Sequence, residues 1–302
     1  MRSFFLRLFF FLLPLGLIAV AAETYVRQMP NSYRLKDEWM RCNADYVETI
    51  ILGNSHAYYG IRPQDLTGRV FNLANVSQIA SYDLALLQHY TPMSRLREVI
   101  LVADNSALFD PPLEQSVPNR CAYYTIYMGI GPHSLWGRYG LEILQFDGFL
   151  EKMKAYRKGT YAMCDSMGWG CNYKSELSTF NEENAAATQR AVQRHTCQDW
   201  HWVEENAKQV EQIASLCQQK GLRLLVVQTP VCAFYNEGVP AQQHAKVRQL
   251  MQKLKKSYGA TILDYSADPR FGGKDFFDAD HLSDVGAIKF TKILNQVHQS
   301  HK

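Results

Sequence analysis

A chain of 302 residues, 47% hydrophobic and 20% charged, is long enough to bury one large core together with an insertion or a membrane anchor. The formal net charge of +3 is small and no run of basic residues stands out, so we expect no nucleic-acid partner. No internal repeat or low-complexity tract is visible.

The amino terminus carries an apolar run, Leu8–Ala22, that contains no charged residue. Arg2 and Arg7 precede this run and Glu23 follows it. Positive residues on the amino side predict that this end stays in the cytoplasm and that the rest of the chain lies outside it. A helix of a soluble core would need a polar face, which the run lacks.

Two interpretations of residues 1–23 remain open. Ala19-Val20-Ala21 matches the small-residue cleavage site of a signal peptide, whose removal would leave a secreted protein. Residues 4–22 could instead form an uncleaved signal anchor, because Phe4 and Phe5 extend the run towards the ~20 residues that span a bilayer. The mixed polar stretch at 24–46 reads as a membrane-proximal lead-in to a domain over 47–302.

The first expected strand and its turn lie within Glu48–Pro63, ETIILGNSHAYYGIRP. Ile50-Ile51-Leu52 has the length and β-branched character of a buried strand, and a helix could begin at about Ser55. A serine on such a turn has its hydroxyl at the carboxyl edge of a sheet, beside the first backbone N–H groups of the helix. Gly53 permits the tight turn. The simpler alternative is a serine that only caps the helix.

Strands and helices alternate along much of the chain, which predicts an α/β fold with a five-stranded parallel sheet and helices on both faces. In the flavodoxin-like strand order 2-1-3-4-5, ligands bind at the carboxyl end of the first strand, and Ser55 would lie there. The expected strands are Val47–Leu52, Arg69–Leu73, Glu98–Ala103, Leu222–Gln228 and Thr261–Tyr265, and the expected helices are Gln78–Tyr90, His201–Lys220, Gln242–Tyr258 and Asp284–Val297.

The alternation is interrupted at about residues 109–199, where prolines, glycines and aromatic residues take over. Two helices are expected there, over Leu141–Tyr156 and Asn181–His195. We interpret this segment as a mostly helical insertion over the active site. Its aromatic side chains could line an acceptor groove, or they could fill a small satellite core.

Seven cysteines fit an exported protein without proving export. Cys164 and Cys171 bracket the loop CDSMGWGC, which a disulfide could close. The alternative is that most of the seven are small buried hydrophobic residues, and Cys217 on the apolar face of an expected helix is the best case for that.

The last motif, FFDADHLSDVGAIKF, covers Phe276–Phe290. Asp278 and His281 stand three residues apart on one turn. The carboxylate can therefore accept a hydrogen bond from one imidazole nitrogen while the other nitrogen faces a serine. Asp280 competes with Asp278 for this orienting role, but the spacing favours Asp278. Ser55, His281 and Asp278 are thus the candidate nucleophile, base and orienting carboxylate.

The order of this serine and the Asp-x-x-His pair resembles the SGNH/GDSL hydrolase superfamily. The wording ILGNSHAYYGIRP, FNLANVSQ and DADHLSDVGA looks like its membrane-anchored, extracytoplasmic branch. That branch includes relatives of the D-alanyl-lipoteichoic acid biosynthesis protein and of alginate O-acetylation proteins. The resemblance covers roughly residues 45–110 and 200–300. It implies a three-layer flavodoxin-like fold and a Ser-His-Asp triad that needs no cofactor or metal.

The resemblance also implies an oxyanion hole, in which three N–H groups hold the negative oxygen of the tetrahedral intermediate. Carried over, the donors are the backbone of Ser55, the backbone of Ser77 after the second strand and the side chain of Asn105 after the third. Ser77 stands where the family has glycine, and Asn105 could equally be a turn residue. His56 and Arg62 could contact the substrate, although packing and a surface salt bridge are the more common roles of such residues.

The residues and the resemblance together predict an extracytoplasmic serine esterase or O-acyltransferase that acts on an acylated cell-envelope carbohydrate or a related ester. The alternative is a non-catalytic binding or assembly module of the same fold that assists a membrane-bound O-acyltransferase. The expected location is the cell membrane, through residues 4–22, with the catalytic domain in the periplasm.

Overall fold

The computed structural model describes residues 1–90, 92–131, 140–144, 146–158, 164–181, 185–197 and 199–300. Its centre is a five-stranded sheet in the order β2-β1-β3-β4-β5, in which every neighbouring pair is parallel. The α/β class and the strand order expected from the sequence are confirmed. The strands are β1 (Thr49–Leu52), β2 (Val70–Asn72), β3 (Glu98–Val102), β4 (Arg223–Gln228) and β5 (Thr261–Asp264).

One face of the sheet is covered by α4 (Ala80–His89), α11 (Val203–Gln219) and α13 (Ala241–Tyr258). Ile50 and Leu52 of β1 belong to this layer of the core and are fully buried. Because successive side chains of a strand point to opposite faces, the residue between them has to be apolar as well if the other face is covered.

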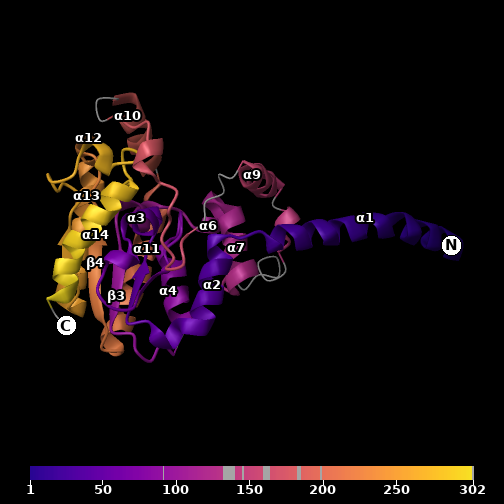
Figure 1. Cartoon of the computed structure of the whole chain (residues 1–302), viewed down its shortest axis with the longest axis horizontal. Helices are drawn as coiled ribbons and strands as arrows, with labels where there is room; N and C mark the ends of the chain where they lie inside the picture. Colours follow the sequence, from indigo (N-terminus) through magenta and orange to yellow (C-terminus); the bar gives the residue numbers. More distant parts are fainter. Residues whose placement is uncertain are drawn as a thin grey trace.

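The opposite face is covered by α3 (Ser55–Gly60), α12 (Ala233–Gly238) and α14 (Asp284–Gln299). Ile51 and Ile100 belong to this second layer. Figure 1 shows α14 along one side of the strands and α4 and α11 along the other. Covering on both faces explains why β1 and β3 are buried along their whole length and read as continuous apolar runs.

The amino-terminal segment is one continuous helix, α1 (Arg2–Gln28), which projects away from the sheet in Figure 1. Within the described residues it is the helix whose length and apolar composition would allow it to cross a membrane. It runs past the boundary expected at residue 23. The lead-in that follows is also helical, with α2 (Ser32–Asn43) and the 3-10 turn η1 (Ala44–Tyr46).

The last turns of α1 belong to the folded domain. Glu23 accepts hydrogen bonds of 3.0 Å from two backbone N–H groups of η3 (Glu142–Leu144). Val26 is fully buried, and its carbonyl accepts a hydrogen bond of 3.0 Å from Lys152 of α9 (Phe146–Arg157). The helix is therefore fixed to the insertion by its polar and apolar contacts together.

In the described part of the segment between β3 and β4 there are helices and turns but no named strand. An isolated backbone bridge between Cys164 and Gly170 closes the loop CDSMGWGC, and no disulfide joins Cys164 to Cys171. Part of the helix expected over 181–195 falls on 182–184, outside the described residues. The remaining elements are α5 (Asn105–Phe109), α6 (Leu113–Ser116), α7 (Pro118–Met128), η4 (Ser175–Leu177), α10 (Ala185–His195), η5 (Trp200–Trp202), η2 (Pro63–Asp65) and η6 (Gly273–Asp275).

Candidate active site

The turn between β1 and α3 carries Ser55 at the first position of the helix. Gly53 has a φ of 125°, and a Cβ added to it would lie 2.9 Å from the Val102 carbonyl oxygen, so only glycine fits. Its backbone N–H donates to Asp83 Oδ1 at 2.7 Å. The side chain of Asn54 caps the helix by accepting a hydrogen bond of 2.9 Å from the backbone N–H of His56. The backbone that holds Ser55 is thus fixed from both sides.

The second part of the site is the loop immediately before α14. A backbone bridge between Phe276 and Leu282 closes this loop. Asp278 Oδ1 accepts hydrogen bonds from the backbone N–H groups of Asp280 and His281, at 3.2 and 2.8 Å. These local bonds fix the carboxylate of Asp278 on the side of the loop where the imidazole of His281 lies.

The structure brings Ser55, His281 and Asp278 into one line of hydrogen bonds, although 226 residues separate the serine from the histidine. Ser55 Oγ lies 2.8 Å from His281 Nε2. On the other side of the ring, His281 Nδ1 lies 2.9 and 3.2 Å from the two oxygens of Asp278. A hydroxyl, a base and an orienting carboxylate in this order can perform nucleophilic attack on a carbonyl carbon.

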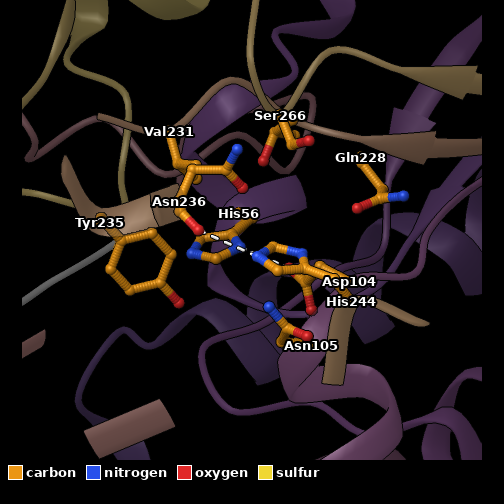
Figure 2. A pocket seen from close by; sticks show the side chains of 10 residues that line it. His56, Asp104, Asn105, Gln228, Val231, Tyr235, Asn236, His244 and Ser266 are labelled. Atoms are coloured by element: carbon orange, nitrogen blue, oxygen red, sulfur yellow. Dashed lines mark hydrogen bonds and ion pairs between the residues drawn. The ribbon is translucent and has the colours of Figure 1, made fainter. Parts of the chain in front are cut away.

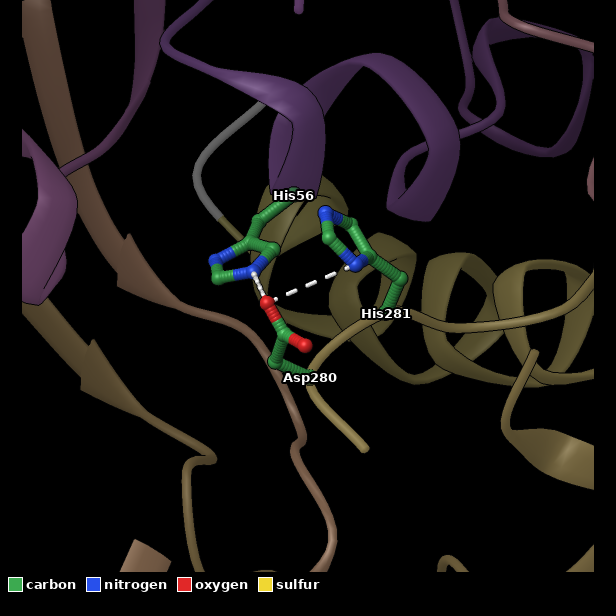
Figure 3. A group of neighbouring side chains, drawn as sticks. All are labelled: His56, Asp280 and His281. Atoms are coloured by element: carbon green, nitrogen blue, oxygen red, sulfur yellow. Dashed lines mark ion pairs between the residues drawn. The ribbon is translucent and has the colours of Figure 1, made fainter. Parts of the chain in front are cut away.

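A second carboxylate, that of Asp280, lies beside the same ring. Its Oδ2 is 3.5 Å from His281 Nδ1 and 3.5 Å from His56 Nε2, and its side chain is fully buried. Figure 3 shows this carboxylate between the two imidazoles. The spacing argument that preferred Asp278 agrees with these distances, because Asp278 is closer to Nδ1 by 0.6 Å (3.5 − 2.9).

His56 is buried between two carboxylates and does not line an open surface. Its Nδ1 is hydrogen-bonded to Asp104, and its Nε2 faces Asp280. Burial disfavours the charged ring, but Asp104 and Asp280 outweigh burial and raise the pKa of His56 to about 10. In the same pair, the imidazolium overcomes the effect of burial and lowers the pKa of Asp104 to about 2. His56 is therefore an internal cation at neutral pH.

Asp280 is ionised for the same reason. Burial alone would raise its pKa, but the rings of His281, His56 and His195 lower it well below its ordinary value. His195 Nε2 lies 3.7 Å from Asp280 Oδ2, and its Nδ1 is 2.6 Å from the Tyr235 hydroxyl. The result is a buried cluster in which carboxylates alternate with imidazoles, and His281 is its one member that also faces Ser55.

Three of these side chains could also be considered as metal ligands. One ligand atom each of His56, Asp280 and His281 lies within 4.8 Å of the other two. His281 Nδ1, however, already makes its hydrogen bond of 2.9 Å to Asp278, so a cation bound here would have to take this nitrogen away from Asp278. The donor set therefore fits the Ser-His-Asp arrangement better than it fits a resident metal.

An aromatic wall stands beside the imidazole of His281. Tyr59 stacks on Tyr173 with ring centroids 3.7 Å apart, and Tyr173 stacks on Phe277 at 4.0 Å. The imidazole of His281 meets the Tyr173 ring edge-on at 5.5 Å. Tyr173 comes from the segment that interrupts the αβ alternation, so at least this aromatic residue of the insertion takes part in the site. Stacked rings hold the base in place and keep bulk water from that side of it.

A small cavity beside His56 is shown in Figure 2. Its volume of about 20 Å³ is enough for one water molecule. His56, Asp104 and Asn105 line it, and Figure 2 shows Asn105 next to Asp104. Asn105 Oδ1 is buried and has no hydrogen-bond partner. Asn105, expected in the oxyanion hole, thus lies on the His56 side of the cluster.

The other two residues singled out from the sequence have defined surroundings. Ser77 has a φ of 60°, an unusual value for a residue other than glycine, and its Oγ accepts a hydrogen bond of 2.9 Å from Arg120. It therefore adopts a backbone conformation that glycine takes far more readily than serine. Arg62 pairs with Asp65 at 3.1 Å and lies over the Trp169 ring at 5.4 Å, so its charge is already used within the fold.

Asp104 and Asp83 were not recognised as site residues from the sequence. Asp104 directly follows β3, and β3 lies next to β1 in the expected order, so its position at the same sheet edge as Ser55 was a usable signal. Asp83 lies in the first turn of α4, where an acidic residue usually reads as solvent-facing. Only the fold reveals that its buried carboxylate holds the backbone of Gly53.

No family model matches this chain, and no curated protein matches it. Among solved structures, it is similar to the crystal structure of a protein from Bacteroides fragilis described as a "putative acylhydrolase". The TM-score is 0.42 and 9% of aligned residues are identical, over 88% of this chain and 96% of the other. The strand order defines the fold independently of this likeness, and the side chains described above define the site.

Proposed function

We propose that this chain is a membrane-anchored, extracytoplasmic serine esterase or O-acyltransferase that acts on an acylated carbohydrate of the cell envelope. The observation that carries the proposal is the line of hydrogen bonds from Ser55 through His281 to Asp278. The apolar composition and length of α1 support the anchor. The carbohydrate class follows from the resemblance of the motifs to envelope O-acylation proteins.

The first half-reaction forms an acyl-enzyme. Ser55 Oγ attacks the carbonyl carbon of the ester while His281 Nε2 takes the hydroxyl proton. Asp278 holds the ring in the tautomer that leaves Nε2 able to accept this proton, and it stabilises the imidazolium that forms. The tetrahedral intermediate then collapses, the bond to the leaving alcohol breaks, and His281 donates the proton to that alcohol.

The negative oxygen of the intermediate needs N–H donors close to Ser55. The backbone N–H of Ser55 at the start of α3 and that of Ser77 are the proposed donors. The hydrogen bond from Arg120 to Ser77 Oγ supports this role, because it helps to hold the loop in its positive-φ conformation. Asn105 remains the proposed third donor, through the N–H groups of its side-chain amide.

The second half-reaction releases the acyl group to whichever nucleophile reaches the acyl-enzyme. His281 takes a proton from water or from an acceptor hydroxyl, which attacks the acyl carbon and displaces Ser55. Hydrolysis and transfer therefore use the same residues. Exclusion of water by the stacked rings of Tyr59, Tyr173 and Phe277 would favour transfer to a bound hydroxyl.

The test is labelling of the detergent-solubilised full-length protein with a fluorophosphonate, followed by peptide mapping. We expect the phosphonyl group on Ser55 and no labelling of Ser55→Ala. Ser116→Ala, an exposed serine away from the site, is the matched control and should be labelled like the wild type. A folded wild type that resists the probe would favour the non-catalytic module that assists a membrane-bound O-acyltransferase.

A further inference from the structure

A second cavity lies between the catalytic domain and the insertion. Its volume is about 280 Å³, at the small end of the range of about 300–1,000 Å³ found for ligand pockets. Residues of α2, α3, α7 and α9 line it, together with Asn75 in the loop that follows β2. A ligand of the size of one sugar ring fits such a space.

Two buried polar side chains line this cavity. Asn75 is 1% exposed and interacts with the Tyr124 hydroxyl, but neither its amide nitrogen nor its amide oxygen makes a hydrogen bond of ordinary geometry. Tyr58 is also 1% exposed, and its hydroxyl interacts with Ser32 but likewise makes no hydrogen bond of ordinary geometry. Buried polar groups are nearly always paired. The Asn75 amide and the Tyr58 hydroxyl would therefore be complemented by a ligand that both donates and accepts hydrogen bonds. Hydroxyl groups do both.

Aromatic side chains form another part of the wall. Tyr33 and Tyr123 line the cavity, with ring centroids 5.4 Å apart. Lys36 Nζ lies 4.5 Å from the centroid of the Tyr58 ring and is hydrogen-bonded to the carbonyl of Ala74, so the cation supports this wall from within the core. Aromatic faces beside amide and hydroxyl groups suit a ring that has both C–H faces and hydroxyl edges.

The charges around the cavity are balanced. Arg120 lines it but donates to Ser77 Oγ at 2.9 Å, and Glu151 on α9 offers the opposite charge. Lys152 is held by Glu142 at 2.5 Å. An anionic ligand would gain from Arg120 and lose against Glu151, and it would find no other unsatisfied cation among the lining residues. A neutral ligand avoids this conflict.

The cavity is connected to the catalytic serine through two short pieces of chain. Tyr58 follows Ser55 by three residues, so both lie on one side of α3. Asn75 precedes Ser77 by two residues in the loop proposed to hold the oxyanion. On these grounds we propose that the cavity is the carbohydrate subsite, and that it binds one neutral sugar unit of the substrate or acceptor. This inference rests on the proposed function.

The test uses the full-length Ser55→Ala protein in detergent, which can bind but not turn over. Cellotetraose, maltotetraose and chitotetraose are the neutral probes, and tetragalacturonate is the anionic one; binding is followed by saturation-transfer NMR. We expect at least one neutral probe to bind. Ala155→Trp, which fills the cavity from α9, should weaken that binding by about tenfold or more, with a smaller loss for Ala155→Leu. Lys154→Trp, exposed on the same helix, is the matched control and should leave binding unchanged.

The same substitutions made with Ser55 intact separate this inference from the proposed function. Ala155→Trp should still react with the fluorophosphonate, which also shows that it is folded. Sugar binding that Ala155→Trp does not affect, no binding of any neutral probe, or binding of tetragalacturonate alone would each overturn the inference. Failure of the wild type to react with the fluorophosphonate, together with neutral-sugar binding that Ala155→Trp weakens, would remove the enzyme and leave the sugar site standing.

Discussion

His56 and Asp280 face each other across 3.5 Å inside the domain, and the carboxylate of Asp280 reaches equally far to His281. The catalytic ring therefore has two carboxylates at its Nδ1 side, one partly exposed and one fully buried. A buried carboxylate needs a compensating cation, and His56 supplies it. This cluster determines several of the expected effects of substitution.

The three members of the triad should differ in sensitivity. Ser55→Ala should abolish turnover of a simple acetyl ester, and His281→Ala should be nearly as damaging, because a hydroxyl without a base is a poor nucleophile. Asp278→Asn should be milder, because Asp280 still lies 3.5 Å from His281 Nδ1. The measurement is kcat/KM for each variant. A larger loss for Asp280→Asn, in a protein that is still folded, would exchange the roles of the two aspartates.

The charge of His56 should stabilise the fold in a pH-dependent manner. Its folded pKa of about 10 lies above its ordinary value of 6.5, so this stabilisation is complete below about pH 6.5 and is lost as the pH rises through about 10. His56→Gln should therefore lower the free energy of unfolding by roughly 2–4 kcal/mol at pH 6, and by much less above pH 10. Urea titrations across this range measure the difference. An equal loss at both pH values would mean that His56 is neutral in the fold.

Lys36 should act in the opposite direction. Burial lowers its pKa from 10.5 to about 7, so its folded form binds fewer protons than the unfolded chain between these values. This costs stability that is recovered as the pH rises towards 10.5. Lys36→Met should therefore raise the free energy of unfolding at pH 7 by roughly 2–4 kcal/mol, with the gain fading near pH 10.5. A destabilised variant at pH 7 would contradict this account.

Gly53→Ala should damage both stability and activity. The added methyl group would lie 2.9 Å from a backbone oxygen at a φ of 125°, so the turn that carries Ser55 must shift. We expect a loss of roughly 2–4 kcal/mol and of most esterase turnover. Gly259→Ala is the control, because its φ of 71° also favours glycine but nothing lies within 4 Å. Equal effects of the two substitutions would show that φ alone matters.

The anchor should remain attached to the domain. Expressed in a diderm bacterium, the protein should resist alkali extraction from the membrane fraction and retain residues 1–22 by mass spectrometry. The reason is structural, since Glu23 and Val26 are in contact with the folded insertion and α1 reaches them without a break. A mature protein that begins near Ala22 or Glu23 would identify the segment as a cleaved signal peptide.

The sheet was predictable because buried parallel strands need apolar residues on both faces, and runs such as Ile50-Ile51-Leu52 have no other simple explanation. The pairing of Asp278 with His281 was predictable because it is local. The role of His56 was not, because its partners Asp104 and Asp280 lie 48 and 224 residues (280 − 56) away along the chain. A histidine next to a nucleophile reads as a residue that packs or meets substrate until these carboxylates are seen.

The lead-in shows a different limit of prediction. α2 buries Lys36 and Asp37, two residue types that normally mark a solvent-facing side, so the stretch reads as polar and mixed. The helix forms because Asn31 caps it and because these charges find internal partners, such as the Tyr90 hydroxyl that donates to Asp37 at 3.0 Å. Partners so distant in sequence leave no local pattern.

The contacts between the end of α1 and the insertion have a mechanical consequence. A domain on a flexible linker can sample a wide volume around its membrane anchor. A domain in fixed contact with a membrane-spanning helix stays at one distance from the bilayer and in one orientation. If α1 spans a bilayer, the contacts of the buried residues Glu23 and Val26 fix the distance of the Ser55 hydroxyl from the lipid surface. Only acceptors that pass within that thin zone could be modified, and a flexible insert placed between the apolar run and Glu23 would widen it.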